Sequence, residues 1–389
     1  MLRQCGSIEL YAPFVCLFSY PAGFFIHYGN KGAKIRTLIY IFSLLVFTIL
    51  SVPPYAECQV VSNSSTITGT ITESTTGDPL QGANVYIAQS LMGAAADAQG
   101  RYTIYNVPPG TYQVVASFIG YKIGKTQIHI DKNSEYYIDF KLEPDALEFE
   151  EIVVTSDRIE EWKRHFDRFK REFFGTTENA DDCTILNPDI LYFDDDRVNR
   201  EFTATARDLL KIENRALGYI VALYLEEFSI ISSIVRIRII PRFSEMTPGS
   251  GEQREQWIEA REKSYSGSLR HFLAVLVRGT LREEAFEVRH ARWIDGKYRY
   301  DQDFTLEQIL SRGRTDHERI LHFKDLLRVD FRNKETSYVE LRDEQVFFNV
   351  LGTLPVPFTI LTYGAMAEKR IADILPIEYS IQQNPEDKD

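Results

Sequence analysis

The sequence predicts two folded parts: a small β-sandwich of about seven strands over residues 66–142, and an α+β domain with a largely antiparallel sheet over residues 159–380. The sandwich is predicted by short extended runs separated by turn residues, as at Gly77-Asp78-Pro79 and Pro108-Pro109-Gly110. This spacing of strands and turns is typical of antiparallel sandwiches. The second part is predicted by an amphipathic helical period that is followed by further strands.

The strands of the sandwich follow from alternating and β-branched residues. In the first run Ile67, Gly69 and Ile71 alternate with threonines, so one face of this strand is apolar. Gly77 and Pro79 end the run, because Gly tolerates positive φ and Pro lacks a ladder donor. The run over 83–87 then resumes the extended chain, and we expect the two runs to pair as a hairpin. The remaining strands are predicted at 101–105 and 111–119, followed by a final pair at 126–130 and 136–142.

Five motifs in this part resemble a known family. They are Gly-x-Ile at 69–71, Pro-Leu-x-Gly-Ala-x-Val at 79–85, Asp-x-x-Gly-x-Tyr at 97–102, Pro-Gly-x-Tyr at 109–112 and Ile-Gly-Tyr at 119–121. In this order they resemble the carboxypeptidase regulatory-like domain, and the resemblance implies a transthyretin-like β-sandwich of the type found in bacterial envelope proteins. We expect this domain to occupy residues 59–144.

The resemblance does not extend to a zinc peptidase. The metal site of such an enzyme needs a His-x-x-Glu pair, and none of the seven histidines has a Glu three residues later. His-Glu-x-x-His, Gly-x-Ser-x-Gly and a phosphate-binding glycine loop are also absent from the sequence. We therefore predict no catalytic residues, no metal ligands and no cofactor.

The chain begins with an N-terminal extension and an export signal over residues 1–58. Three basic residues, Lys31, Lys34 and Arg36, precede an apolar run at 38–52, which is the order of a secretory signal peptide. We expect cleavage near Gln59 and export, either to the periplasm or to a place in association with the outer membrane. An uncleaved anchor is the alternative for residues 38–52, and a misassigned start codon is our interpretation of the unusually long stretch Met1–Asn30.

The net charge and the cysteines exclude some classes of binding partner and of cross-link. The chain of 389 residues has a net charge of −12, and removal of residues 1–58 takes away four basic and two acidic side chains, which leaves −14. This balance disfavours nucleic acid as a partner. Beyond residue 58 the only cysteine is Cys183, so no internal disulfide is expected there, and we interpret Cys183 as a buried, inert thiol.

An acidic linker is predicted over residues 145–158. It ends in Glu151-Ile152-Val153-Val154-Thr155, which resembles the stretch after the same sandwich in TonB-dependent receptors, where an added strand recruits the energy-coupling protein. This resemblance implies a role as an accessory to TonB-linked uptake. The alternative is that residues 152–155 are simply a strand of the next domain.

The α+β domain opens with an aromatic stripe. Trp162, Phe166, Phe169 and Phe173 recur at helical spacing, and Gly175 is expected to close this helix. We expect strands at 190–193, 201–206, 219–225, 233–240, 286–288, 319–323, 326–331, 337–341 and 345–350, helices at 252–263 and 268–277, and a short helix that opens at Thr305.

Three polar segments of this domain are candidate sites. Asp194-Asp195-Asp196 lacks the spacing of a calcium loop, so we interpret it as a hairpin tip. Glu213-Asn214-Arg215 is interpreted as a structural turn. The segment Tyr265–His271 is the strongest candidate, because Ser268 and His271 meet at a predicted helix start. No acid is evident as a third partner, and helix capping explains the serines more simply.

These segments, with Asn187-Pro188 and residues 373–379, resemble the long form of carboxypeptidase regulatory-like proteins in Gram-negative bacteria. The resemblance implies an architecture and a cell-envelope location without a mechanism. We predict a non-catalytic exported protein that binds a protein, peptide or glycan through residues 159–380, followed by a polar tail at 381–389. The alternatives are an envelope hydrolase with a site near Tyr265–His271 and the TonB-linked accessory role.

Overall fold

The computed structural model describes residues 64–130, 134–145, 156–232, 234–295, 297–301, 305–355 and 359–379. The predicted signal peptide, the stretch Met1–Asn30, the motif at 151–155 and the tail at 381–389 lie outside these residues. Among the residues described, no helix is both long and apolar enough to cross a membrane.

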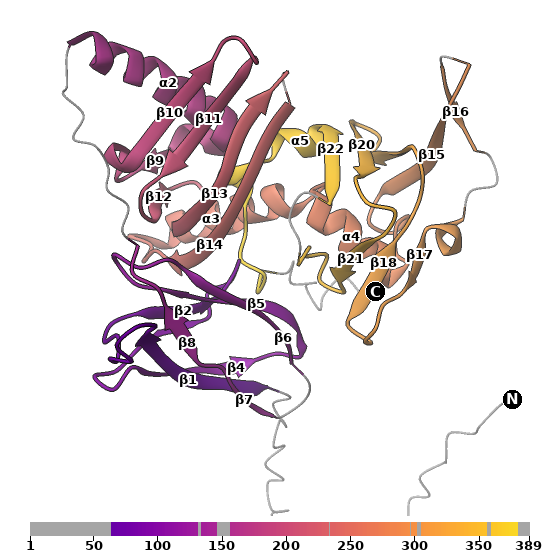
Figure 1. Cartoon of the computed structure of the whole chain (residues 1–389). Coiled ribbons are helices and arrows are strands. Elements are labelled where there is room, and N and C mark those ends of the chain that lie inside the picture. Colours follow the sequence, from indigo (N-terminus) through magenta and orange to yellow (C-terminus); the bar gives the residue numbers. More distant parts are fainter. Residues whose placement is uncertain are drawn as a thin grey trace, which may run out of the picture. The chain divides into compact units, whose positions relative to one another are not determined.

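The N-terminal part consists of β-sandwich-like strands in two sheets (Figure 1). One sheet contains β4 (Arg101–Val107), β1 (Ser65–Glu73), β7 (Glu135–Tyr137) and β8 (Phe140–Leu142). The other has the order β3 (Gly93–Ala95), β2 (Asn84–Ile87), β5 (Gly110–Ser117) and β6 (Gly124–Ile130). The inward residues of both sheets, such as Ile67, Val85 and Val114, are fully buried and form one core.

Two strand pairings differ from the prediction. The expected hairpin of residues 66–72 with 83–87 is wrong, because β1 and β2 lie in different sheets and β1 pairs with β4. The expected pair of 126–130 with 136–142 is also wrong: β6 pairs with β5, while β7 and β8 run parallel to β1. Alternation of side chains reveals that a segment is a strand, but it carries no information on which strand lies beside it.

The next part is a six-stranded antiparallel sheet covered by the helix α2 (Ser156–Phe174). The sheet order is β10 (Leu191–Asp196), β11 (Glu201–Ala206), β13 (Tyr219–Ile231), β12 (Leu210–Asn214) and β9 (Cys183–Ile185), and β14 (Ile234–Glu245) pairs with β13 along its length. The short helices η1 (Glu178–Asp182) and η2 (Pro188–Ile190) lie between α2 and β10.

The aromatic stripe of α2 packs onto this sheet as the helical period predicts. Phe169 and Phe173 are fully buried, and the ring of Phe169 lies 4.7 Å from that of Phe228 on β13. Gly175 follows the helix with φ of +94°, a left-handed conformation that favours glycine at a helix end. The helix prediction is therefore confirmed at both its apolar face and its end.

The last part adds two helices, a five-stranded sheet and a three-stranded sheet. The helices are α3 (Gly251–Tyr265) and α4 (Leu269–Arg278). The larger sheet has the order β16 (Lys297–Tyr300), β15 (Phe286–Ile294), β19 (Leu326–Phe331), β20 (Glu335–Leu341) and β22 (Ile360–Gly364). The smaller one has the order β17 (Leu310–Arg312), β18 (Glu318–Leu321) and β21 (Val346–Asn349). The remaining short elements are η3 (Leu306–Gln308), α5 (Ala365–Glu368) and η4 (Ile371–Asp373).

The region predicted as one α+β domain thus contains two main sheets, each with its own core. Phe272 and Leu276 of α4 pack with Val329 and Phe331 of the five-stranded sheet, apart from the core beneath α2. Both sheets are antiparallel, so this region is a mixed α/β region with antiparallel sheets. The length and side-chain period of a strand do not reveal the sheet to which it belongs, so the sequence did not indicate two sheets.

A C-terminal segment ties the sandwich to the rest of the chain. Ile377 is buried in the sandwich core, and its N–H donates to the carbonyl of Gln89 at 2.8 Å. The N–H of Gln89 in turn donates to the carbonyl of Pro241 on β14, and the N–H of Leu91 donates to the Glu378 carboxylate. The sandwich core is therefore completed by a residue from the far end of the sequence.

Candidate binding cleft

A cleft of about 670 Å³ lies between β14, the start of α4, β22 and the stretch from α5 to residue 375. Its walls are mostly apolar. The apolar side chains that line it come from all four elements and from the stretch before β22; they include Val235, Ile237, Ile239, Leu269, Leu354, Ile360, Met366, Ile374 and Leu375. A concave, largely apolar hollow of this size is the usual form of a ligand site.

Two strand edges face this cleft. On β14 the carbonyl of Pro241 and the N–H of Phe243 bond to residues 89 and 90, on the side away from β13. Because main-chain groups alternate in direction along a strand, Val235, Ile237 and Ile239 also turn their N–H and C=O groups to that side. Among the described strands, β13 alone pairs with residues 235–239 of β14.

β22 ends the five-stranded sheet in the same way. The N–H of Arg342 donates to the carbonyl of Thr359, which places residues 359, 361 and 363 on the β20 side of the ladder. Ile360, Thr362 and Gly364 therefore direct their main-chain groups away from β20. Within the part of the chain that the structure describes, β22 has β20 as its sole partner strand.

The first of the charged side chains at the cleft, Lys369, forms hydrogen bonds with backbone carbonyls. Its Nζ donates to the carbonyls of Lys263 (2.9 Å), Ser264 (3.3 Å) and Ser266 at the end of α3. These carbonyls have no partner within the helix, so an ammonium group is well placed there. Burial lowers the pKa of Lys369 from its usual value.

Arg270 forms hydrogen bonds mainly with the C-terminal segment. Its guanidinium donates to the carbonyls of Pro376 (2.8 Å), Ile377 (2.7 Å) and Tyr379 (2.7 Å), with longer contacts to those of Leu351 and Leu375. A guanidinium has five N–H donors in a fixed plane, and here they are spread over five carbonyls. Arg270 therefore holds the segment that enters the sandwich core.

The acidic group of the cleft, Asp373, is also fully engaged. Its Oδ1 accepts hydrogen bonds from Asn179 (2.8 Å) and Ser264 (3.0 Å), and its Oδ2 accepts one from Thr177 (2.6 Å). Asp373 is 8% exposed. These contacts join η4 to α3 and to the segment around η1, so the role of this carboxylate is to position those elements.

The segment Tyr265–His271 forms the junction between α3 and α4. Ser268 caps α4 by accepting a hydrogen bond on Oγ from the backbone N–H of His271 at 3.1 Å, which confirms the capping interpretation. The N–H of Gly267 donates to Nδ1 of His271 at 3.1 Å, and Nε2 faces a carboxylate oxygen of Glu284 at 3.4 Å. Both ring nitrogens are thus engaged by groups other than the Ser268 hydroxyl.

Burial also keeps the His271 ring neutral. The ring is packed against Tyr265 and Phe286, and His271 is 2% exposed. Burial lowers the pKa of His271 against the opposing effect of Glu284. Glu284 is a partner that sequence reasoning missed, because nothing in the spacing of residues 271 and 284 relates them before α4 and the following turns are placed.

The other candidate segments occupy structural positions. Asp196 accepts hydrogen bonds from the backbone N–H groups of Val198 and Asn199, so the acidic run ends β10 beside the tip of the β10–β11 hairpin, close to the predicted position. Asn214 is 1% exposed and accepts from the N–H of Leu217 in the turn before β13, which confirms the structural interpretation of 213–215.

Cys183 is buried at the start of β9, and burial raises the pKa of its thiol to about 12. A thiol in this state is a poor nucleophile, in agreement with the interpretation of Cys183 as inert. Among the residues that the structure describes, no group of three or more His, Cys, Asp or Glu side chains is placed to hold a metal ion.

Comparison with known families identifies the N-terminal part. Residues 67–154 match the model described as the CarboxypepD_reg-like domain. These residues are a CarboxypepD_reg-like domain. The resemblance that the sequence motifs indicated is confirmed for this domain, and the rest of the chain is unassigned. The search of the curated proteins finds no match to the chain.

Three solved structures that are similar to this chain match it over 21% to 29% of its length. A 5-hydroxyisourate hydrolase from Klebsiella pneumoniae is 21% identical, with a match that covers 21% of this chain and 92% of that chain at a TM-score of 0.19. The backbone protein of the group B streptococcus pilus 2b is 16% identical and covers 21% and 42%, also at 0.19. A cohesin-X-dockerin complex from Acetivibrio cellulolyticus is 20% identical and covers 29% and 76%, again at 0.19. At these TM-scores the likenesses carry no argument about the function of this chain.

Proposed function

We propose that this chain is a non-catalytic, exported protein of the cell envelope that binds an extended polypeptide in the cleft between β14 and β22. In this proposal the CarboxypepD_reg-like domain is a transthyretin-like sandwich that serves as a scaffold, and the apolar run at 38–52 directs export to the periplasm or the outer membrane. Specific binding belongs to the mixed α/β region.

The observation that carries this proposal is that the charged side chains described above at the cleft already have partners within the protein. Lys369, Arg270 and Asp373 are occupied by backbone carbonyls and neighbouring side chains. The rest of the lining is mostly apolar, and two strand edges with outward N–H and C=O groups lie along it. An extended polypeptide satisfies both, because it can pair with a strand edge and place alternate side chains on an apolar surface.

The contacts around Tyr265–His271 support binding over hydrolysis. A serine nucleophile needs a base that accepts its proton, and the Ser268 hydroxyl instead caps α4. The His271 ring is held between Gly267 and Glu284. For hydrolysis, the Ser268 hydroxyl and the His271 ring would both have to leave their present hydrogen bonds.

A test of the proposal uses the main-chain direction at Ile237. Proline at this position removes an N–H that faces the cleft and leaves the ladder to β13 intact, since proline is tolerated on edge strands. We expect the purified parent protein to enrich peptides with alternating apolar residues from a phage-displayed library of random decapeptides. Ile237→Pro should lose this enrichment by at least tenfold.

The matched control is Arg236→Ala, one residue away on β14 and with its side chain on the opposite face of the strand. It should bind the selected peptides as the parent does, with both variants checked for an unchanged melting temperature. If the parent enriches no peptides above an empty support, or if Ile237→Pro binds the selected peptides as tightly as the parent, the proposal is wrong.

A further inference from the structure

A second hollow lies on the other side of β22. It is a trough of about 510 Å³ lined by six residues, namely Tyr298, Asp325, Leu326, Tyr338, Glu340 and Tyr363. Tyr363 lines both this trough and the cleft, so β22 forms the wall between them. The residues come from β16, the turn before β19, β19 itself, β20 and β22.

The trough lies on the face of the five-stranded sheet that is opposite to α4. Phe286, Val329 and Phe331 pack with α4 in the core, so the residues that alternate with them point the other way. Arg328 of β19 and Tyr338 of β20 are direct neighbours on that face, as are Tyr338 and Tyr363 of β22. No helix among the described residues packs on this side.

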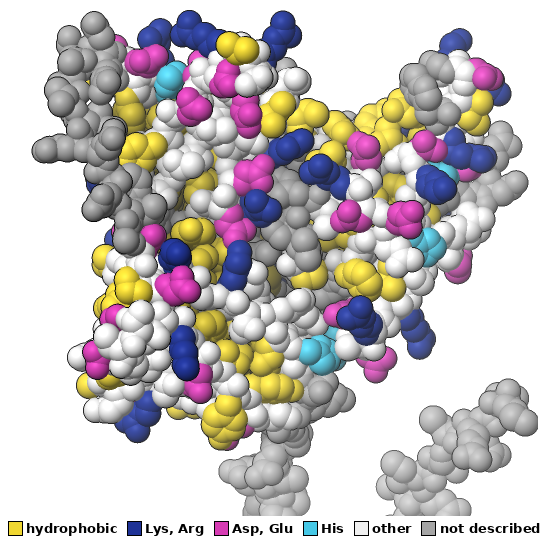
Figure 2. All heavy atoms as spheres, in the orientation of Figure 1, with side chains coloured by type: hydrophobic (Ala, Val, Ile, Leu, Met, Phe, Trp, Pro, Cys, Tyr) yellow, Lys and Arg dark blue, Asp and Glu magenta, His cyan; other side chains and the backbone are white. Residues whose placement is uncertain are grey.

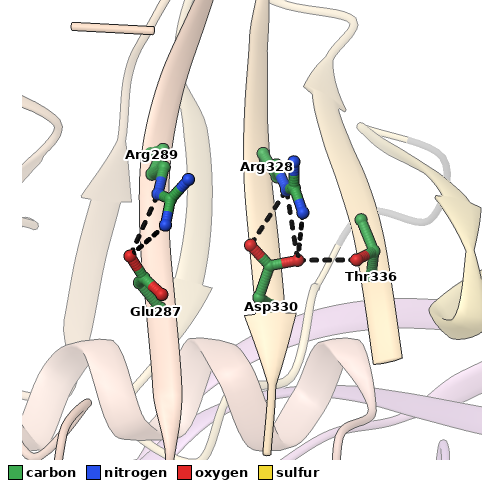
Figure 3. A network of polar contacts seen from close by, with 5 residues as sticks. All are labelled: Glu287, Arg289, Arg328, Asp330 and Thr336. Carbon is green, nitrogen blue, oxygen red and sulfur yellow. Dashed lines mark hydrogen bonds and ion pairs between the residues drawn. The ribbon is translucent and has the colours of Figure 1, made fainter. Parts of the chain in front are cut away.

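Two arginines on the open face of this sheet already have carboxylate partners. Figure 3 shows the network on the same face, in which Arg289 contacts Glu287 at 2.5 Å and Arg328 contacts Asp330 at 2.9 Å. Thr336 adds a hydrogen bond to Asp330 at 2.6 Å. These two arginines are therefore neutralised within their own strands, and none of the six lining residues is cationic. Over the outer surface drawn in Figure 2, by contrast, basic and acidic side chains are interspersed.

The lining combines aromatic rings with carboxylates. Tyr298 is 45% exposed and Tyr363 is 41% exposed. The hydroxyl of Tyr363 donates to Oε2 of Glu340 at 2.7 Å, and this hydrogen bond raises the pKa of Tyr363 to about 12, so the phenol stays neutral. The carboxylate of Asp325 has no hydrogen-bond or ion-pair partner among the described residues.

Tyrosine faces attract cations because the ring quadrupole is negative above the plane, and nearby carboxylates add charge attraction. An anionic ligand would meet two carboxylates without a compensating cation. The composition of the trough therefore favours an organic cation, an ammonium or guanidinium group, over a phosphate or a carboxylate.

We propose that the trough receives a lysine or arginine side chain of the polypeptide that binds in the cleft. The inference rests on the proposed function, because a peptide paired with the outward main-chain groups of Ile360 and Thr362 would extend the five-stranded sheet by one strand. Adjacent strands lie about 4.8 Å apart, so alternate side chains of the added strand would lie beside Tyr363 on the open face. The partner is then an extended segment with apolar residues toward the cleft and a basic residue toward the trough.

The experiment compares three synthetic peptides, Ac-(Val-Lys)3-NH2, Ac-(Val-Gln)3-NH2 and Ac-(Val-Glu)3-NH2, in titrations with the purified protein by calorimetry. The lysine peptide should bind at least tenfold more tightly than the glutamine peptide, and the glutamate peptide should bind most weakly. The lysine preference should also shrink as salt is added, because it comes from exposed charges.

The variant Asp325→Asn/Glu340→Gln removes both charges at nearly constant shape and leaves an acceptor for Tyr363. It should reduce the lysine preference to less than threefold and leave the affinity for the glutamine peptide unchanged. The matched control is Asp343→Asn, an exposed carboxylate just after β20 and outside the trough, which should keep the preference.

The outcomes separate the two proposals. Equal binding of the lysine and glutamine peptides, or a lysine preference that survives in the double variant, overturns the trough assignment and leaves the cleft proposal standing. If no peptide binds the parent, the cleft proposal fails and the trough assignment fails with it.

Discussion

Replacement of Arg270 by Met should detach the C-terminal segment from the body of the protein. Met keeps most of the length of the aliphatic stem and removes the guanidinium, which bonds the carbonyls of Pro376, Ile377 and Tyr379. Among the described residues, no carboxylate lies within hydrogen-bond or ion-pair distance of Arg270, so all of its hydrogen bonds go to backbone carbonyls.

The size of the effect follows from the three short hydrogen bonds, which are 2.7 to 2.8 Å long. A hydrogen bond to a charged group contributes about 1.5 to 3 kcal/mol, and water that reaches the released carbonyls recovers part of this. Removal of the unpaired arginine charge from a buried position offsets a further part. We therefore expect Arg270→Met to lower the free energy of unfolding by about 3 to 5 kcal/mol.

Hydrogen exchange measured by mass spectrometry, together with urea denaturation, tests this expectation. In the variant the amide of Ile377, which donates to Gln89, should exchange much faster than in the parent. The matched control is Arg278→Met at the other end of α4, where the guanidinium is half-exposed and pairs with Glu284. It should cost less than about 1 kcal/mol. An Arg270→Met protein with parental protection at Ile377 and a loss below 1 kcal/mol would refute the role we assign to this arginine.

Three further predictions concern stability. Ile377→Ala should cost about 2 to 5 kcal/mol, because it opens a cavity in the sandwich core, and thermal melting measures it. The lowered pKa of His271 means that the folded state binds fewer protons than the unfolded state between pH of about 4 and 6.5. The free energy of unfolding should therefore rise with pH over that interval and flatten in His271→Asn, as urea titrations at several pH values would reveal. Gly218→Ala should cost at least about 2 kcal/mol, since φ is +69° and the added Cβ would lie 2.3 Å from the ring of Trp257; Gly77→Ala, with similar φ and open space, should cost only about 1 kcal/mol.

Local features of the chain were predicted where local physics decides them. The run from Ser65 to Glu73 is a strand because its residues alternate, and Ser268 caps α4 because a hydroxyl before a helix satisfies a free N–H. The motifs in residues 66–142 led to the CarboxypepD_reg-like domain. The signal peptide, the envelope location and the TonB-linked role remain predictions.

The candidate cleft could not be predicted in the same way, because its parts meet only in the folded chain. Arg270 and Lys369 look like ordinary surface cations in the sequence, and their carbonyl partners at 376–379 and 263–266 are recognised only when α3, α4 and the C-terminal segment are placed. The parallel pairing of β1 with β7 and β8 was missed for the same reason. A spacing signal does exist for the trough, since Tyr338 and Glu340 alternate along one strand, but it does not reveal that Tyr298 and Tyr363 lie beside them.

The burial of Ile377 among the sandwich strands has a consequence for biogenesis. During synthesis, the segment that forms the sandwich emerges long before the residue that completes its core. Until that residue arrives, the sandwich presents an unfilled apolar site, and closing so long a loop is a slow step in folding. A chain cut short by proteolysis or premature termination would keep the site open, which would expose it to chaperones and proteases. Completion of the sandwich core therefore has to wait until residue 377 has been synthesised.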